Sequence, residues 1–229
     1  MKSLCFDSGP IISLAMGRLL WILKPLKEHF GGKFYITPSV RRELVERPLK
    51  IKRFQFEALE VIKLLKEGVI EVYDTIPQNI ANKLDHMANK TYTRDGRPLK
   101  IIHSGEIETV ACAMALKNHG IVMDERTTRL LIEKPTQLKK LLGRRLHTSV
   151  QPIPQNIKEF TTFVGKIKII RSIELVAAAY KLGILNDYIP ALRNGKSTLL
   201  DAVLWGTKYN GCAVTENEIL EIKKTLLTS

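Results

Sequence analysis

Cysteine is scarce in this sequence of 229 residues, which contains only Cys5, Cys112 and Cys212. An odd number of widely spaced cysteines suits buried thiols in a reducing compartment, and it argues against a disulfide framework or a zinc site. The five histidines show no paired ligand spacing either. No apolar run approaches the length that crosses a bilayer, and no signal peptide is recognised. We therefore expect a cytoplasmic protein with no membrane partner.

Acidic residues are also in the minority, with 23 Asp and Glu against 36 Lys and Arg, which gives a net charge of +13. Such a surplus favours a polyanionic partner, nucleic acid above all, although a basic protein without such a partner is the alternative. Aromatic residues make up 7% of the chain, and we expect no stacked aromatic platform for base recognition. Sequence specificity therefore cannot be argued at this level.

The stretch from residue 104 to residue 125 organises the chain, because it predicts a helix followed by a buried strand. Ser104 is expected to cap the helix, and Gly120 is expected to end it. The apolar run 121–123 is typical of a central strand. Glu106 stands in the first helical turn and Asp124 directly follows the strand. In an open α/β sheet these positions face the ligand crevice.

Strands and helices alternate along the first half of the chain, which predicts an α/β fold with a doubly wound parallel sheet flanked by helices. The expected strands are 3–6, 33–36 and 69–73, and the expected helices are 10–16, 19–29 and 39–45. Residues 48–66 are expected to begin as a basic turn and to become an amphipathic helix.

The rest of the chain is expected to be mainly helical. The expected helices are 77–90, 126–133, 172–182, 196–209 and 215–227, with a strand or extended segment at 166–170. Residues 91–102 are expected to form an exposed basic loop, residues 134–145 are rich in basic side chains, and Pro152 and Pro154 mark a loop.

Four carboxylates occupy comparable places in these elements. Asp7 ends the first strand, Glu43 lies in the helix after the second strand, and Glu106 and Asp124 flank the central unit. Acids without His or Cys are typical of sites for Mg²⁺ or Mn²⁺. Each acid taken singly is better explained as a turn, helix-terminus or surface charge, whereas the matching places of all four together favour a cluster. Asp201, in the middle of a predicted helix, is assigned as a surface or capping carboxylate.

Three segments resemble PIN domains, and most closely the prokaryotic PIN-like proteins with a Gly-Glu motif at the third acid. They are residues 6–14, residues 35–44, and Gly105-Glu106 followed by Asp124. The resemblance implies a PIN-like core over 1–150 with a basic insertion around 74–102, and a helical C-terminal extension over 151–229. It also implies a metal-dependent ribonuclease in which Asp7, Glu43, Glu106 and Asp124 bind one or two Mg²⁺ or Mn²⁺ ions. The products would carry a 5′-phosphate and a 3′-hydroxyl.

An acid site repels a phosphate chain, so RNA would have to be held by polar and basic residues around it. The candidates near the acids in the sequence are Ser8, Arg41, Arg42, Arg126 and Arg129. The alternatives are a non-catalytic RNA-binding or scaffold module on the same fold, a nuclease for structured DNA, and a toxin paired with a protein antitoxin. A homodimer is expected only by analogy with proteins of this fold.

Overall fold

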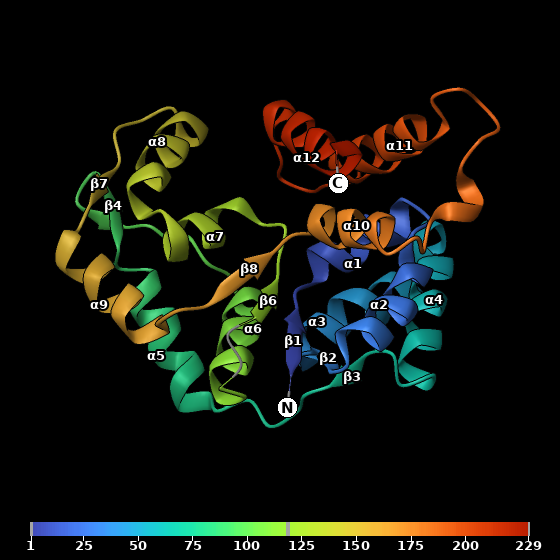
Figure 1. Ribbon diagram of the computed structural model, residues 1–229. Coiled ribbons are helices and arrows are strands. Elements are labelled where there is room, and N and C mark those ends of the chain that lie inside the picture. The colour runs from blue at the N-terminus through green and yellow to red at the C-terminus, as the bar shows by residue number, and fades with distance from the viewer. Residues whose placement is uncertain (1, 118–119, 229) are drawn as a thin grey trace.

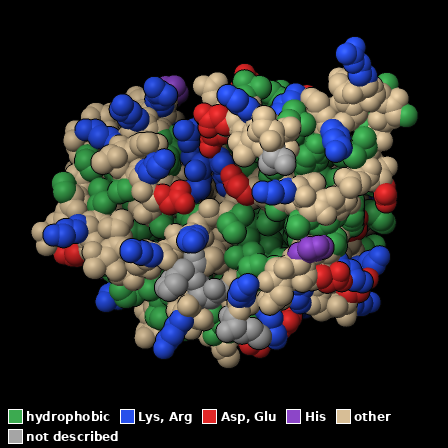
Figure 2. Space-filling model, viewed as in Figure 1, with side chains coloured by type: hydrophobic (Ala, Val, Ile, Leu, Met, Phe, Trp, Pro, Cys, Tyr) green, Lys and Arg blue, Asp and Glu red, His purple; other side chains and the backbone are tan. Residues whose placement is uncertain are grey.

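The computed structural model describes residues 2–117 and 120–228, and a parallel five-stranded sheet lies at its centre (Figure 1). The strand order is β3-β2-β1-β6-β8, and every neighbouring pair is parallel. The strands are β1 (Ser3–Phe6), β2 (Lys33–Ile36), β3 (Glu71–Val72), β6 (Gly120–Val122) and β8 (Lys168–Ile170). The predicted parallel sheet is confirmed, and Lys and Arg side chains are spread over the visible surface, as the net charge predicts (Figure 2).

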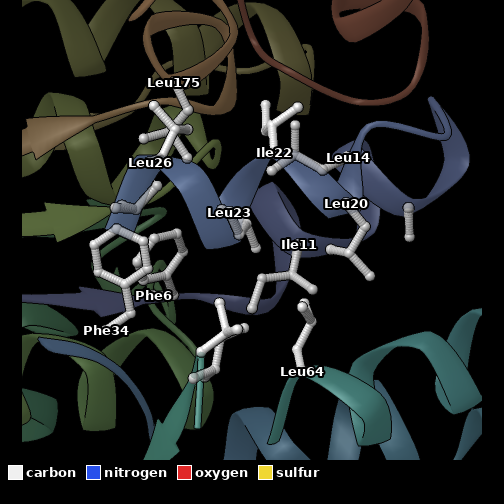
Figure 3. Close-up of a cluster of buried hydrophobic side chains, with 14 of the residues drawn as sticks. Phe6, Ile11, Leu14, Leu20, Ile22, Leu23, Leu26, Phe34, Leu64 and Leu175 are labelled. Carbon is white, nitrogen blue, oxygen red and sulfur yellow. The ribbon is translucent and has the colours of Figure 1, made fainter. Parts of the chain in front are cut away.

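Alternate residues of the central strands enter two different cores, which is the signature of a doubly wound sheet. Phe6 and Val122 belong to the core on one face, whereas Cys5 and Ile121 belong to the core on the other. The first core (Figure 3) takes its remaining apolar side chains mainly from four helices. These are α1 (Ser8–Met16), α2 (Leu23–Phe30), α4 (Gln55–Lys66) and α10 (Ser172–Lys181).

The second core lies under a different group of helices. They are α5 (Gln78–Ala88), α6 (Ser104–Ala115), α7 (Arg126–Glu133), α8 (Pro135–Leu146) and α9 (Pro154–Val164). Here the Sγ atoms of Cys5 and Cys112 lie 3.0 Å apart, and all three cysteines are buried and free. The prediction of buried thiols without disulfides is therefore confirmed.

The expected loop at 91–102 is instead a β-hairpin in a second, three-stranded sheet. Its strands are β4 (Tyr92–Arg94), β5 (Arg97–Pro98) and β7 (Gln151–Pro152). Asp95 and Gly96 both have positive φ, as the two-residue Asp-Gly turn of a tight hairpin requires. Tyr92, at the start of this hairpin, is fully buried and packs in the second core. Pro154, expected to mark a loop with Pro152, is instead the first residue of α9, because proline suits the first turn of a helix.

The last part of the chain forms the expected helical region. Helices α10, α11 (Gly195–Tyr209) and α12 (Glu216–Thr228) share a small apolar cluster of their own, formed by Ile173, Leu200, Leu204, Cys212, Val214 and Ile219. Asp201 pairs with Lys223 between α11 and α12 and is therefore a surface carboxylate, as expected. Both sheets take a strand from beyond residue 150, so they span the expected domain division, which stays a prediction.

Short helical segments connect these elements. They are α3 (Pro38–Arg41), the π-helical turn η2 (Arg42–Glu46), and the 3₁₀ turns η1 (Leu20–Ile22), η3 (Pro48–Lys50), η4 (Lys52–Phe54) and η5 (Asn186–Tyr188). Residues 48–66 thus begin with turns and become a regular helix at Gln55, as expected. Among the helices in the described part of the chain, none combines the length and apolar character that a membrane crossing requires.

Candidate functional site

Two of the four candidate acids lie where the winding of the sheet reverses. The chain passes from β1 toward β2 on one side, whereas β6 lies on the other side of β1. Asp7 directly follows β1 and Asp124 lies just beyond β6, and the backbone N–H of Asp7 donates to the carbonyl of Val122 at 2.9 Å. The crevice at such a switch point is the usual ligand site of an open α/β sheet.

Glu43 reaches the same crevice from the turn after β2. The hydroxyl of Thr37 accepts the backbone N–H of Val40 at 3.3 Å, so α3 starts at the end of β2 and carries the chain into η2. The Ser8 hydroxyl donates to Oε2 of Glu43 at 2.8 Å. A Cβ at Gly105 would stand 3.3 Å from Oε1 of Glu43, so glycine here leaves room for that carboxylate.

Glu106 is fixed by the start of α6, in a way the sequence did not predict. His103, not Ser104, is the N-cap residue, and Ser104 is the first residue of the helix. Oε2 of Glu106 accepts the backbone N–H of His103 at 2.8 Å. This is the reciprocal contact of a capping box, and it holds one oxygen of the carboxylate against the helix terminus.

All four acids line one cleft of about 740 Å³. The sequence predicted that they would share one edge of the sheet, and the structure brings them together there from four different elements. Their catalytic and metal-binding roles stay predictions. The other lining residues are Ser8, Gly9, Arg47, His103, Ser104, Gly105, Glu125, Arg126, Gly211 and Ala213.

Asp124 is the most firmly held of the four acids. Its Oδ2 accepts the hydroxyl of Ser13 at 2.9 Å and that of Ser172 at 2.7 Å, and its Oδ1 accepts the backbone N–H of Ser172 at 2.8 Å. Only 3% of Asp124 is exposed. The carboxylate thus ties α1 and α10 to the end of β6, and it enters the cleft in a fixed orientation.

Burial and mutual repulsion shift the protonation of two acids toward neutral pH. Burial raises the pKa of Asp7 to about 6, the charges of Glu43 and Asp124 add to that shift, and the N–H groups of Ser8 and Gly9 oppose it. Burial likewise raises the pKa of Glu106 to about 7, with further repulsion from Asp7 and Glu125. A cation in the cleft would relieve this repulsion.

The donor set fits a hard divalent cation that keeps part of its water shell. Every candidate ligand is a carboxylate oxygen, which Mg²⁺ and Mn²⁺ prefer. Within residues 2–117 and 120–228, no group of three or more His, Cys, Asp or Glu side chains is placed so that it could hold a metal ion. Ser8, His103 and the two serines around Asp124 each hold a carboxylate oxygen through a hydrogen bond.

The structure separates the five candidate nucleic-acid contacts. Ser8 lines the cleft with its hydroxyl on Glu43, and Arg126 lies at the rim. Arg129 lies in the adjoining cleft, described below. Arg41 pairs with Glu46 at 4.0 Å and lines another pocket, while Arg42 donates to the hydroxyl of Ser39 at 2.7 Å. Arg41 and Arg42 therefore do not line the acid cleft.

Two cleft residues escaped the sequence analysis. Arg47 lines the cleft from the residue after η2, four residues beyond Glu43, which is the spacing of one helical face. That spacing was a usable signal. Glu125 caps α7 by accepting the backbone N–H groups of Thr127 and Thr128, and it also lines the cleft. Its capping role follows from its place before the helix, whereas its contribution to the cleft needed the three-dimensional structure.

Comparison with known proteins gives one match. A protein-family model described as a PIN domain matches residues 3–135, which is more than half of the 229 residues. No curated protein and no solved structure matches the chain. The matched region contains all four acids of the cleft.

Proposed function

Because this chain belongs to the PIN domain family, whose members are generally nucleases, we propose that it is a metal-dependent ribonuclease that hydrolyses RNA phosphodiester bonds. The observation that carries the proposal is the convergence of four acids, delivered by β1, η2, α6 and β6, in one cleft at the switch point of the sheet. The Gly-Glu subgroup of the family stays a prediction.

Asp7, Glu43, Glu106 and Asp124 would hold one or two Mg²⁺ or Mn²⁺ ions. When bound, such an ion lowers the pKa of a coordinated water and stabilises the leaving oxygen of an in-line displacement at phosphorus. Ser8 would orient Glu43 through its hydrogen bond, and Ser13 and Ser172 would orient Asp124. Partners of this kind around metal ligands typically change metal affinity or activity by about 10- to 100-fold.

The cations at the rim would attract the substrate and place its phosphate. Arg47 and Arg126 are exposed and border the acids, so they would screen the repulsion between carboxylates and the phosphate chain. The net charge of +13 supports a polyanionic substrate. RNA is proposed as the substrate class from the resemblance to the family, and a non-catalytic RNA-binding module or a nuclease for structured DNA are the competing outcomes of the test.

The test is cleavage of a labelled single-stranded RNA by the full chain with Mn²⁺ or Mg²⁺, with a structured DNA in parallel. The Asp7→Asn variant is compared with a matched control, Asp201→Asn, which neutralises an acid paired with Lys223 outside the cleft. We expect metal-dependent RNA cleavage in the wild type and in Asp201→Asn, and cleavage at least about 100-fold slower in Asp7→Asn. Equal cleavage by all three proteins would overturn the proposal. Cleavage of DNA alone would overturn its substrate class, and salt-sensitive RNA binding without cleavage would support the non-catalytic module.

A further inference from the structure

A second cleft, of about 540 Å³, adjoins the acid cleft. Arg126 and Ala213 line both clefts, so the two lie side by side. One wall of the second cleft comes from α7 and the start of α8, and the other from the end of α11 and the segment leading into α12. Basic side chains gather in the hollow between these helices (Figure 2).

The second cleft carries a surplus of positive charge. Its cations are Arg126, Arg129, Lys134 and Lys208, and its one acid is Glu218. That acid is already compensated, since Arg171 donates to its Oε1 at 2.8 Å and Thr215 donates to its Oε2. We call this site the basic cleft.

Several cations of the basic cleft remain free for a ligand. Nε of Arg129 is buried and finds no hydrogen-bond partner in the described ranges, while its Nη1 lies 3.9 Å from Glu133. Among the ion pairs of residues 2–117 and 120–228, none includes Arg126 or Lys134. Arg126 and Lys134 can therefore donate charge-assisted hydrogen bonds to phosphate oxygens without first breaking an ion pair.

An aromatic pair lies beside this cleft on α11. The rings of Trp205 and Tyr209 are stacked, with centroids 5.9 Å apart and planes 27° from parallel. Lys208, which lines the basic cleft, holds its Nζ 4.6 Å from the centre of the Trp205 ring. Trp205 packs against the C-terminal apolar cluster, whereas Tyr209 is 76% exposed. No such pair was identified from the sequence, and its role in base recognition stays a proposal.

We propose that single-stranded RNA runs from the acid cleft into the basic cleft, with a phosphate on Arg126 and Arg129 and a neighbouring base stacked on Tyr209. The proposal rests on the proposed function, because it concerns the strand that flanks the cleaved bond. An exposed aromatic face beside a groove of cations is the arrangement that binds unpaired bases without regard to their sequence. It requires the C-terminal helices, which lie outside the matched family region.

A second aromatic pair provides a matched control. Trp21 and Tyr188 are stacked at 6.0 Å and 26°, and Tyr188 is 62% exposed. The pocket beside Trp21 is lined by Lys24, Lys63, Glu60 and Glu67, and it shares no residue with either cleft. The two aromatic pairs are therefore stacked in a similar way. Only the Trp205–Tyr209 pair lies beside a cleft that adjoins the acid cleft.

The experiment measures RNA binding by the full chain in an Asp7→Asn background, which removes cleavage from the readout. Trp21→Phe leaves Trp205 as the sole tryptophan of a chain that has two. We expect a single-stranded RNA to quench Trp205 fluorescence, and an abasic strand of equal length to quench it far less. Tyr209→Ala should weaken binding by about tenfold, Tyr209→Phe should restore it, and Tyr188→Ala should leave it unchanged.

Equal binding by Tyr209→Ala and its parent, or equal quenching by the abasic strand, would overturn the stacking site. The cleavage assay on the wild type separates this result from the proposed function. Cleavage with no effect of Tyr209→Ala leaves the nuclease and removes the inferred site. Binding and quenching without cleavage in the wild type keep the RNA site and remove the nuclease.

Discussion

The acid cleft and the basic cleft are neighbours that share Arg126 and Ala213 but differ in charge and origin. The acid cleft is built around the ends of the central sheet, and its four acids lie within the region matched to the family. The basic cleft needs α11 and the segment before α12, which follow that region. The difference suggests a division of labour, in which one site performs the chemistry and the other holds the substrate.

The two clefts also differ in how many hydrogen-bond and ion-pair partners their charged side chains have. The acids are held by serine hydroxyls and by a helix N-terminus, so their oxygens are fixed before any ligand arrives. In the basic cleft, Arg129 and Lys208 lie near Glu133 and Glu216, whereas none of the ion pairs of residues 2–117 and 120–228 includes Arg126 or Lys134. Fixed oxygens suit a metal and a transition state, whereas cations without an acid partner suit the phosphates of a strand of any sequence.

The largest expected effect comes from neutralising an acid. Asp7→Asn should lower the rate of RNA cleavage at saturating metal by at least about 100-fold, since it removes a candidate metal ligand at the switch point. RNA binding should persist or become tighter, because a negative charge near the phosphate is lost. Single-turnover cleavage and filter binding on the same preparation would check both effects. Loss of binding in parallel with cleavage would contradict the division of labour.

The second effect is a pH dependence of stability in the metal-free protein. The pKa of Asp7 is raised to about 6 in the folded state, so the folded protein keeps its proton where the unfolded chain loses it. Stability should therefore be highest below pH 4 for this group and should fall as the pH rises through 6, by on the order of 3 kcal/mol.

Thermal unfolding with a chelator at pH 5 and pH 8 measures this dependence. Relative to the wild type, Asp7→Asn should be more stable at pH 8, with little difference at the lowest pH. Mn²⁺ should stabilise the wild type at pH 8 and do so less at pH 5, because protonated acids bind metal weakly. An identical pH profile of stability for the wild type and Asp7→Asn would show that the ionisation of Asp7 does not destabilise the folded protein.

A smaller effect is expected from the support of Asp124. Ser172→Ala removes the hydroxyl that donates to Oδ2 at 2.7 Å but keeps the backbone N–H bond to Oδ1. The variant should lose about 1–3 kcal/mol of stability, because a buried acceptor loses a partner. Denaturant unfolding would measure it, with Thr198→Ala, in the exposed first turn of α11, as the control. No loss of stability would mean that Ser13 alone satisfies this oxygen.

The smallest effect belongs to a single cation of the basic cleft. Arg129→Ala should weaken RNA binding a few-fold and should reduce the slope of log affinity against log salt by about one. Arg41→Ala, at a pocket away from both clefts, is the matched control and should change neither quantity. If Arg41→Ala reduced the slope as much as Arg129→Ala, binding would be spread over the whole basic surface.

The two clefts also differ in how far the sequence could predict them. Asp7 and Asp124 follow apolar strands, so parallel pairing alone places them at one edge of the sheet. The wall formed by Lys208 depends on how α11 packs against the rest of the chain, which no local pattern encodes. The Trp205–Tyr209 pair did carry a signal, since the two residues are four apart in a predicted helix. Asp95-Gly96 is a recognisable hairpin turn, but the basic residues around it favoured the prediction of an exposed loop.

The most direct measurement is the steady-state kinetics of RNA cleavage for the wild type, Asp7→Asn and Arg129→Ala over a range of RNA concentrations. The division of labour predicts that Asp7→Asn lowers kcat with little change in KM, and that Arg129→Ala raises KM with little change in kcat. If Arg129→Ala lowered kcat as much as Asp7→Asn did, with KM unchanged, the two clefts would act as one catalytic site and the central claim would be wrong.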